Sequence, residues 1–279
     1  MKIVKKIAEL QRSIRPIKKK GKTIGFVPTM GYLHEGHLSL IKIAHKHSDY
    51  VVCSIFVNPT QFGPNEDFNR YPRDLKRDEE LLRKEKADLL FYPFLKEIYP
   101  DGYRTYVEVE EFSSILCGKS RPGHFRGVTT VVLKLFNIIE PDIAVFGEKD
   151  YQQLLIIRKM VKDLNLNVKI ISAPIVREND GLAMSSRNTY LNPEQRTSAA
   201  VLYQSLQWAR GSFYKENIKS PEYLTTVMRQ MIEAKGGQID YIAIVDKNDL
   251  SPVKFIKKGD RMLVAVFFGK TRLIDNLEI

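Results

Sequence analysis

The stretch Lys22-Thr-Ile-Gly-Phe-Val-Pro28, continued by Thr29-Met-Gly-Tyr-Leu-His-Glu-Gly-His37, carries the features that decide the fold. Its first seven residues form an apolar run closed by proline, which is typical of a buried strand. Its second part contains two glycines and leads into a helical pattern over residues 38–46. A strand, a glycine-containing turn and a helix in this order predict the opening unit of an α/β sheet.

The same alternation continues along the chain until about residue 171. The run over residues 49–57 (DYVVCSIFV) is continuously apolar and β-branched, as a strand covered on both faces should be. Further strands are expected at residues 88–92, 142–146 and 168–171. Helices are expected at residues 3–15, 75–86, 128–139 and 152–163. Alternating strands and helices predict a parallel sheet with right-handed crossovers.

The pattern changes near residue 177, where a polar, glycine-containing linker begins. Two helices are expected after it, at residues 193–213 and 221–234, the first capped by Asn192. Strands are expected at residues 239–245 and 262–268. We therefore predict a catalytic α/β domain over residues 1–186 and a smaller C-terminal α+β domain over residues 187–279.

Composition excludes several classes of protein. The 279 residues carry a net charge of +11, but residues 1–22 hold nine basic side chains and one acidic one, so the rest is nearly neutral. That distribution argues against extended nucleic-acid binding. No apolar run approaches the roughly 18 residues of a membrane span. Two cysteines outside any zinc-type spacing fit a reducing compartment, and we expect a cytoplasmic protein.

His34-Glu-Gly-His37 follows the first predicted strand and opens the first predicted helix. In such sheets ligands bind at the carboxyl ends of strands, and helix N-termini attract phosphate. Two imidazoles three residues apart can hydrogen-bond a phosphoryl group as its leaving group departs. Surface histidines or half of a zinc site are the alternatives, which the position between strand and helix disfavours.

Four other segments carry polar side chains that suit a ligand site. Phe56-Val-Asn-Pro-Thr-Gln-Phe62 offers neutral amides, Gly147-Glu-Lys-Asp-Tyr-Gln-Gln153 a lysine, and Ala183-Met-Ser-Ser-Arg-Asn188 an arginine with hydroxyls. Tyr71-Pro-Arg-Asp-Leu-Lys-Arg-Asp78 offers Arg73 to an anion or Asp78 to Mg²⁺. Each has an ordinary structural alternative, such as a turn, a helix cap or a solvated face. Four elements at strand ends, together with the Ala183–Asn188 loop in the linker, indicate one nucleotide site.

These segments, together with Gly123-His-Phe-Arg-Gly-Val-Thr-Thr130, closely resemble the pantoate–β-alanine ligases, which are AMP-forming pantothenate synthetases. His34-Glu-Gly-His37 and the Ser-Ser-Arg loop also resemble the HIGH and KMSKS elements of the wider nucleotidyltransferase superfamily. The resemblance implies a Rossmann-like domain holding the site, a C-terminal domain acting as a lid, and a homodimer. It also implies ATP and Mg²⁺ as requirements, and ATP, pantoate and β-alanine as the small-molecule partners.

The resemblance further assigns site residues. It implies that catalysis rests on His37 as proton donor, with His34 and Lys149. It implies ATP contacts from Met30, Gly31, Tyr32, Leu33, His34, Glu35, Gly36, His37, Gly147, Glu148, Lys149, Asp150, Val176, Met184, Ser185, Ser186 and Arg187. It gives pantoate to Gln61 and Gln153, β-alanine to Gln61 and Asn58, and the metal to Asp78. Tyr32 stands where the family commonly has Ala.

The implied reaction condenses (R)-pantoate with β-alanine to pantothenate, AMP and diphosphate through a pantoyl adenylate. Two alternatives stay open at this point. A nucleotidyltransferase or tRNA synthetase-like enzyme would use the same nucleotide site with a nucleotide or an amino acid in place of pantoate. A nucleic-acid-binding module would use the basic N-terminus, and its binding would depend steeply on salt.

Overall fold

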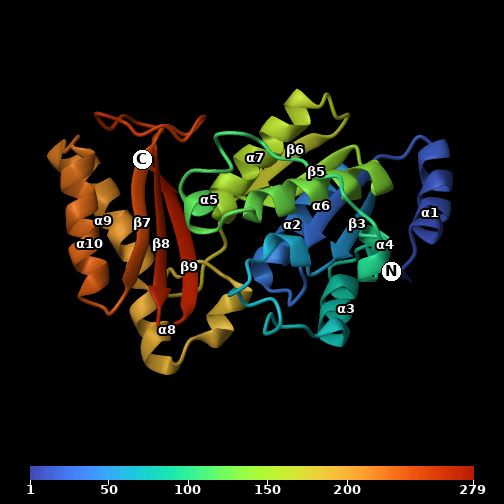
Figure 1. Cartoon of the computed structure of the whole chain (residues 1–279), viewed down its shortest axis with the longest axis horizontal. Helices are drawn as coiled ribbons and strands as arrows, with labels where there is room; N and C mark the ends of the chain where they lie inside the picture. Colours follow the sequence, from blue (N-terminus) through green and yellow to red (C-terminus); the bar gives the residue numbers. More distant parts are fainter. The chain divides into compact units, whose positions relative to one another are not determined.

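Six parallel strands form the sheet of the N-terminal part of the chain, in the order β1-β4-β3-β2-β5-β6. Figure 1 labels β3, β5 and β6 of this sheet. The computed structural model describes all residues from 1 to 279. The strands are β1 (Lys2–Val4), β2 (Ile24–Thr29), β3 (Tyr50–Ile55), β4 (Leu89–Phe91), β5 (Ile143–Gly147) and β6 (Lys169–Ala173). The prediction of a parallel α/β sheet is confirmed.

The direction of the chain through this sheet reverses beside β2. After β2 the chain moves outward to β3 and β4, and it then crosses back to place β5 on the other side of β2. Such a switch point leaves a crevice at the carboxyl ends of the two strands, where open α/β sheets bind ligands. β2 ends at Thr29 and β5 at Gly147, so the segments that follow both strands start at this crevice.

The helices between β1 and β6 are α1 (Ile7–Lys19), α2 (Glu35–His47), α3 (Leu75–Lys84), α4 (Leu95–Ile98), α5 (Cys117–Ser120) and α6 (His124–Ile139), followed by α7 (Tyr151–Asp163), with 3-10 turns η1 (Pro59–Gln61) and η2 (Glu148–Asp150). η2 and α7 belong only in part to this first unit, because Lys149–Leu155 groups with the second one. α2 packs on β2, β3 and β5, and its Leu38 and Ile41 are buried with Val27 and Val51 in the core. Burial of these apolar side chains is the main stabilising contribution.

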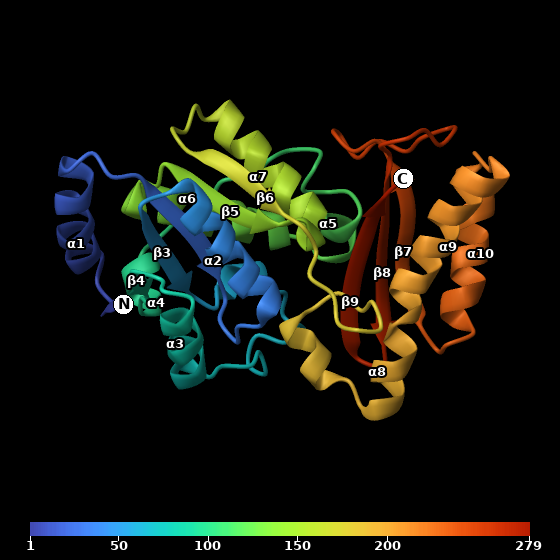
Figure 2. The same cartoon turned by 180° about the vertical axis from the view of Figure 1, so that it is seen from behind.

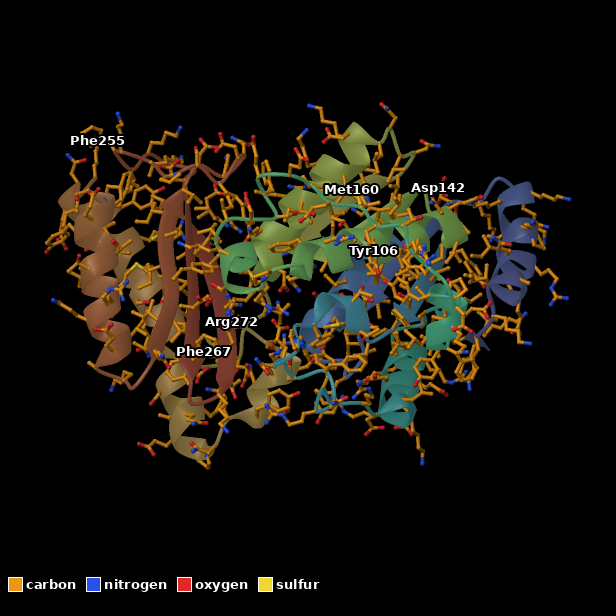
Figure 3. The ribbon with its side chains drawn as sticks, viewed as in Figure 1. Tyr106, Asp142, Met160, Phe255, Phe267 and Arg272 are labelled. Carbon is orange, nitrogen blue, oxygen red and sulfur yellow. The ribbon has the colours of Figure 1, made fainter.

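The segment between α4 and α5 is fastened to α6. Val107 N donates to Thr130 Oγ1 at 3.0 Å, and Thr129 Oγ1 donates to the Val107 carbonyl. Tyr106, labelled in Figure 3, comes from this segment, and the Arg126 guanidinium lies 4.1 Å from its ring centroid. These contacts fasten the segment along α6, which itself packs against η1.

The second unit is built on an antiparallel sheet of β7 (Gln238–Val245), β8 (Arg261–Phe268) and β9 (Thr271–Glu278). Its helices are α8 (Pro193–Ala199), α9 (Val201–Glu216) and α10 (Pro221–Glu233), preceded by the 3-10 turn η3 (Ser186–Tyr190). α9 and α10 pack side by side against this sheet (Figure 2). Their buried residues Leu206 and Met228 share a core with Val264 and Val266.

The two units divide the chain differently from the expected boundary between residues 186 and 187. The first comprises Met1–Glu148 and Ile156–Pro174, and the second comprises Lys149–Leu155 and Ile175–Ile279. Residues 175–186 belong with the second unit because Arg177 forms an ion pair with the buried Asp275 of β9. Lys149–Leu155 also belongs with the second unit, because Asn276 donates to the Lys149 carbonyl and the Tyr151 hydroxyl donates to the Lys247 carbonyl.

Some elements differ from the sequence-based expectation at their ends. The basic helix expected over residues 3–15 begins at Ile7, because Ile3 and Val4 pair with β4 as strand β1. The single helix expected over residues 193–213 is interrupted at Ala200 and forms α8 and α9. Asn192 caps α8 as predicted, by accepting from Gln195 N. No helix of the chain has the length and apolar content needed to cross a membrane.

Candidate active site

The His34 and His37 side chains form the N-terminal cap of α2, directly beyond the carboxyl end of β2. His34 Nδ1 accepts from Gly36 N at 3.2 Å, and His37 Nδ1 accepts from His34 N at 3.4 Å. The two ring centroids lie 4.1 Å apart, and both side chains are half-buried. Because backbone N–H groups only donate, each Nδ1 is unprotonated, and the proton of each neutral ring lies on Nε2.

The loop between β2 and α2 has a backbone that few residues adopt. Gly31 has φ +83°, and a Cβ there would lie 2.9 Å from Ile55 Cγ2 and 3.1 Å from Asp78 Oδ2. Tyr32 follows with φ +52°, which is uncommon for a residue with a side chain. Both carboxyl oxygens of Asp78 hold this loop, accepting from Tyr32 N and Leu33 N at 2.7 Å each.

These bonds decide whether Asp78 fits a metal. Asp78 lies on α3, is 1% exposed, and Arg77 Nη1 is 3.8 Å from its Oδ1. Burial raises its pKa, although the two loop N–H groups oppose that shift. No group of three His, Cys, Asp or Glu side chains that could hold a metal ion occurs in the chain. Asp78 therefore does not fit as a Mg²⁺ ligand, because it is buried, each of its oxygens already accepts a backbone N–H group, and it is not part of any group of potential ligands.

Asn58 and Gln61 lie on the turn that follows β3, and they are brought together with Met30. Asn58 Nδ2 donates to Gln61 Oε1 at 3.1 Å, and Gln61 Nε2 contacts Met30 Sδ at 3.2 Å. Asn58 is 1% exposed, and its Nδ2 also donates to the Gly127 carbonyl. Its Oδ1 accepts from Thr60 and from the Tyr99 hydroxyl. Asn58 thus orients the amide of Gln61, which is half-buried.

α6 approaches this turn very closely at Gly127. A Cβ at Gly127 would lie 2.4 Å from the Thr60 carbonyl oxygen and 2.7 Å from Gln61 Cα. Only glycine permits helix and turn to lie at this distance. The position of Gln61 therefore depends on a residue far from it in the sequence.

In the second unit, Lys149 and Asp150 form an ion pair, with Nζ and Oδ2 3.4 Å apart. The Lys149 carbonyl accepts from Asn276 Nδ2 at 2.9 Å, which ties this turn to β9. The Tyr151 hydroxyl donates to the Lys247 carbonyl, and the Arg261 guanidinium lies 4.1 Å from the Tyr151 ring centroid. The Lys149 side chain is 21% exposed, so its charge is partly accessible.

A hairpin carries the loop from Met184 to Arg187. Met184 N donates to the Val176 carbonyl at 3.0 Å, so these two expected ATP residues are neighbours. Arg177 fastens the hairpin through two bonds to Asp275, of 2.6 and 2.9 Å. Burial raises the pKa of Asp275, and Arg177 opposes that shift. Beyond the hairpin, Ser185 Oγ accepts from Arg187 N and so opens η3.

Sequence reasoning did not find several residues that hold the site in shape. Asp78 bonds Tyr32 of the loop, and Arg177 pairs with Asp275. In both cases the partners lie far apart in the sequence, and no local pattern connects them. His124 and Arg121 surround the Gln61 carbonyl. The Gly-His-Phe-Arg-Gly segment at residues 123–127 was the available signal for them, because it matched the family without an assigned role.

Known proteins resemble this chain over its full length. The family model described as pantoate-beta-alanine ligase matches residues 2–278. A pantothenate synthetase from Acetivibrio thermocellus is 55% identical over 277 residues, covering 99% of each chain. One from a Sulfurihydrogenibium species is 55% identical over 280 residues, covering all of both chains.

Solved structures agree with this likeness. The crystal structure of a pantothenate synthetase from Thermus thermophilus has a TM-score of 0.94 at 46% identity, covering 100% of this chain and 99% of that one. A pantoate-beta-alanine ligase from Francisella tularensis, complexed with beta-gamma ATP and beta-alanine, has a TM-score of 0.84 at 42% identity. That comparison covers 100% of this chain and 97% of the other.

Proposed function

The chain belongs to the pantoate–β-alanine ligase family, and from that premise we propose that it couples its two substrates through a pantoyl adenylate. It is an ATP-dependent ligase that produces pantothenate. A carboxylate resists attack by an amine because oxide is a poor leaving group. Transfer of AMP to the pantoate carboxylate removes this obstacle, since AMP is a good leaving group.

In the first step, a pantoate carboxylate oxygen attacks the α-phosphorus of ATP, and the bond to the bridging oxygen of diphosphate breaks. The observation that carries the proposal most directly is that His34 Nδ1 and His37 Nδ1 both accept backbone N–H groups, which places the proton of each ring on Nε2. An Nε2–H group can donate a hydrogen bond to a phosphate oxygen as negative charge develops there. We assign the proton-donor role to His37, and charge neutralisation to His34, Lys149 and Arg187.

The remaining ATP contacts are proposed along the same segments. They comprise Met30, Gly31, Tyr32, Leu33, Glu35, Gly36, Gly147, Glu148, Asp150, Val176, Met184, Ser185 and Ser186. The N-terminus of α2 supports this assignment, because the aligned peptide dipoles of the helix give that end a partial positive charge, which attracts phosphate.

Pantoate is assigned to the neutral amides of Gln61 and Gln153, which can bond a hydroxyl or carboxylate without adding charge. We also propose that Gln61 contacts β-alanine. A contact between Asn58 and β-alanine would require one of the existing bonds of its amide to break. We therefore propose that Asn58 acts on β-alanine indirectly, by orienting Gln61.

In the second step, the neutral amine of β-alanine attacks the acyl carbon of the adenylate. The bond to AMP breaks, AMP leaves with the electron pair, and the new amide nitrogen loses a proton. The protein needs mainly to position the reactants and to exclude water, because the mixed anhydride hydrolyses readily.

Three broader properties complete the proposal. Mg²⁺ enters as part of the substrate, bound by triphosphate oxygens, which suits an ion that prefers such ligands to a protein cage. The chain forms a homodimer, as the resemblance implies. The enzyme works in the cytoplasm, where ATP is supplied.

The decisive experiment mixes the enzyme with ATP, Mg²⁺ and pantoate in the absence of β-alanine. We expect pantoyl adenylate and diphosphate, detected by mass spectrometry and by exchange of labelled diphosphate into ATP. An amino acid or a nucleotide in place of pantoate should give neither product. Exchange that depends on one of those compounds instead would identify a different member of the superfamily, and exchange without any acid would refute the coupling.

A further inference from the structure

The Gly-His-Phe-Arg-Gly segment at residues 123–127 has no place in the mechanism above, yet its histidine touches Gln61. We propose that His124 is a positioning residue, which sets the place of Gln61 by bonding its backbone carbonyl. Arg121 and Glu66 hold the imidazole in the state that this bond requires. The proposal rests on the proposed function, because it takes Gln61 as the contact for pantoate.

The contacts converge on one carbonyl group. His124 Nδ1 lies 2.8 Å from the Gln61 carbonyl oxygen, and Arg121 Nη2 lies 3.4 Å from the same oxygen. Arg121 Nη1 is 3.1 Å from His124 Nε2. Glu66 accepts from Arg121 Nε at 2.8 Å and from its Nη2 at 2.6 Å. The His124 residue is only 9% exposed, so water competes little for these bonds.

Donor and acceptor chemistry fixes the state of the ring. The Gln61 carbonyl oxygen only accepts, so His124 Nδ1 carries a proton and donates it. The Arg121 guanidinium only donates, so His124 Nε2 accepts and is unprotonated. The imidazole is therefore neutral, with the opposite tautomer from His34 and His37. Glu66 balances the charge of Arg121 in a bidentate pair, which gives the guanidinium a defined orientation.

The consequence is that Gln61 is held at both ends. His124 fixes its backbone carbonyl, while Asn58 and Met30 contact the oxygen and the nitrogen of its side-chain amide. Gln61 is the last residue of the three-residue turn η1, which has little structure of its own to hold it. A binding group preorganised in this way loses little freedom when its ligand arrives.

The test compares His124→Leu with His124→Asn. Leucine removes the donor, whereas the amide nitrogen of asparagine can occupy the position of Nδ1 and restore it. For His124→Leu we expect a rise of about tenfold in the KM for pantoate, the factor that loss of about 1.4 kcal/mol gives. The KM for ATP should stay within about twofold. His124→Asn should recover most of the affinity for pantoate.

Repeating the substitution in a Gln61→Ala enzyme distinguishes a positioning role of His124 from a general disturbance of the structure. In a Gln61→Ala enzyme, His124→Leu should have no further effect on the KM for pantoate. The side-chain amide of residue 61, whose place His124 sets through the backbone, is absent from that enzyme. A full additional loss there, or equal changes in the KM for ATP, would overturn the proposal. If His124→Leu does not fold, Glu66→Gln replaces it as the test variant. An unchanged KM for pantoate in Glu66→Gln would also overturn the proposal. A wild-type enzyme without pantoate-dependent diphosphate release would instead refute the proposed function.

Discussion

Replacement of Gly127 by alanine tests how strictly the packing of α6 against η1 determines the activity. Gly127 lies inside α6, where alanine is intrinsically favoured over glycine by about 1 kcal/mol. Helix propensity alone therefore predicts a more stable protein. Any loss in the variant must come from contacts of the added methyl group.

Those contacts are with backbone atoms, which have little room to adapt. The new Cβ would lie 2.4 Å from the Thr60 carbonyl oxygen, 2.6 Å from the Thr60 carbonyl carbon and 2.7 Å from Gln61 Cα. Ordinary van der Waals contact begins at 3.4 Å, so η1 must retreat by about 1 Å. A shift of that size can lower a rate by about 10²-fold, and overpacking costs about 1–3 kcal/mol.

We expect Gly127→Ala to reduce kcat/KM for pantoate by about 10²-fold while the protein still folds. After the gain in helix propensity, the free energy of unfolding should fall by at most about 2 kcal/mol. The assays are pantoate-dependent diphosphate release and urea unfolding followed by circular dichroism.

Gly211 of α9 supplies the matched control, because a Cβ there meets nothing within 4 Å. Gly211→Ala should leave activity unchanged and stabilise the protein by up to about 1 kcal/mol. Wild-type kcat/KM for pantoate in Gly127→Ala would refute the reasoning, since η1 would then tolerate the displacement.

Three further predictions concern other parts of the site and its support. His37→Ala should slow pantoate-dependent diphosphate exchange by about 10²–10³-fold. His45→Ala, at the exposed end of the same helix, should not slow it. Near-wild-type exchange in His37→Ala would exclude the role assigned to His37. Asp78→Asn should leave the Mg²⁺ concentration for half-maximal activity unchanged at fixed ATP, because the carboxylate of Asp78 holds the loop by accepting two backbone N–H groups. A markedly higher Mg²⁺ concentration for half-maximal activity would show that Asp78 is a metal ligand. Arg196 lowers the pKa of Asp180, so the stability from this pair is present above the ordinary aspartate pKa of 3.8 and is lost as the pH falls through the lowered value. Asp180→Asn should accordingly cost about 0.5–1 kcal/mol at pH 7 and nearly nothing at pH 2, measured by urea unfolding, and an equal cost at both values would contradict the linkage.

Local pattern determined the central strands and the identity of the family. β2, β3 and β5 were predictable because a strand buried on both faces must be apolar along its whole length, and this property is visible in a short window. The His34–His37 motif was predictable for a similar reason, since strand, turn and helix follow one another directly. Strand β9 escaped prediction because Asp275 and Asn276 are buried within it, against the usual apolar pattern.

Only the tertiary structure decided which side chains hold the site in shape. Asp78 was expected to bind a metal, yet it accepts two bonds from loop residues that lie 46 and 45 positions earlier in the chain. His124 bonds a carbonyl 63 positions earlier, and Arg177 pairs with an aspartate 98 positions later. A hydrogen bond is specified by the approach of two atoms in space, and that approach is created by packing between elements. The sequence of either segment alone therefore does not predict the hydrogen bond.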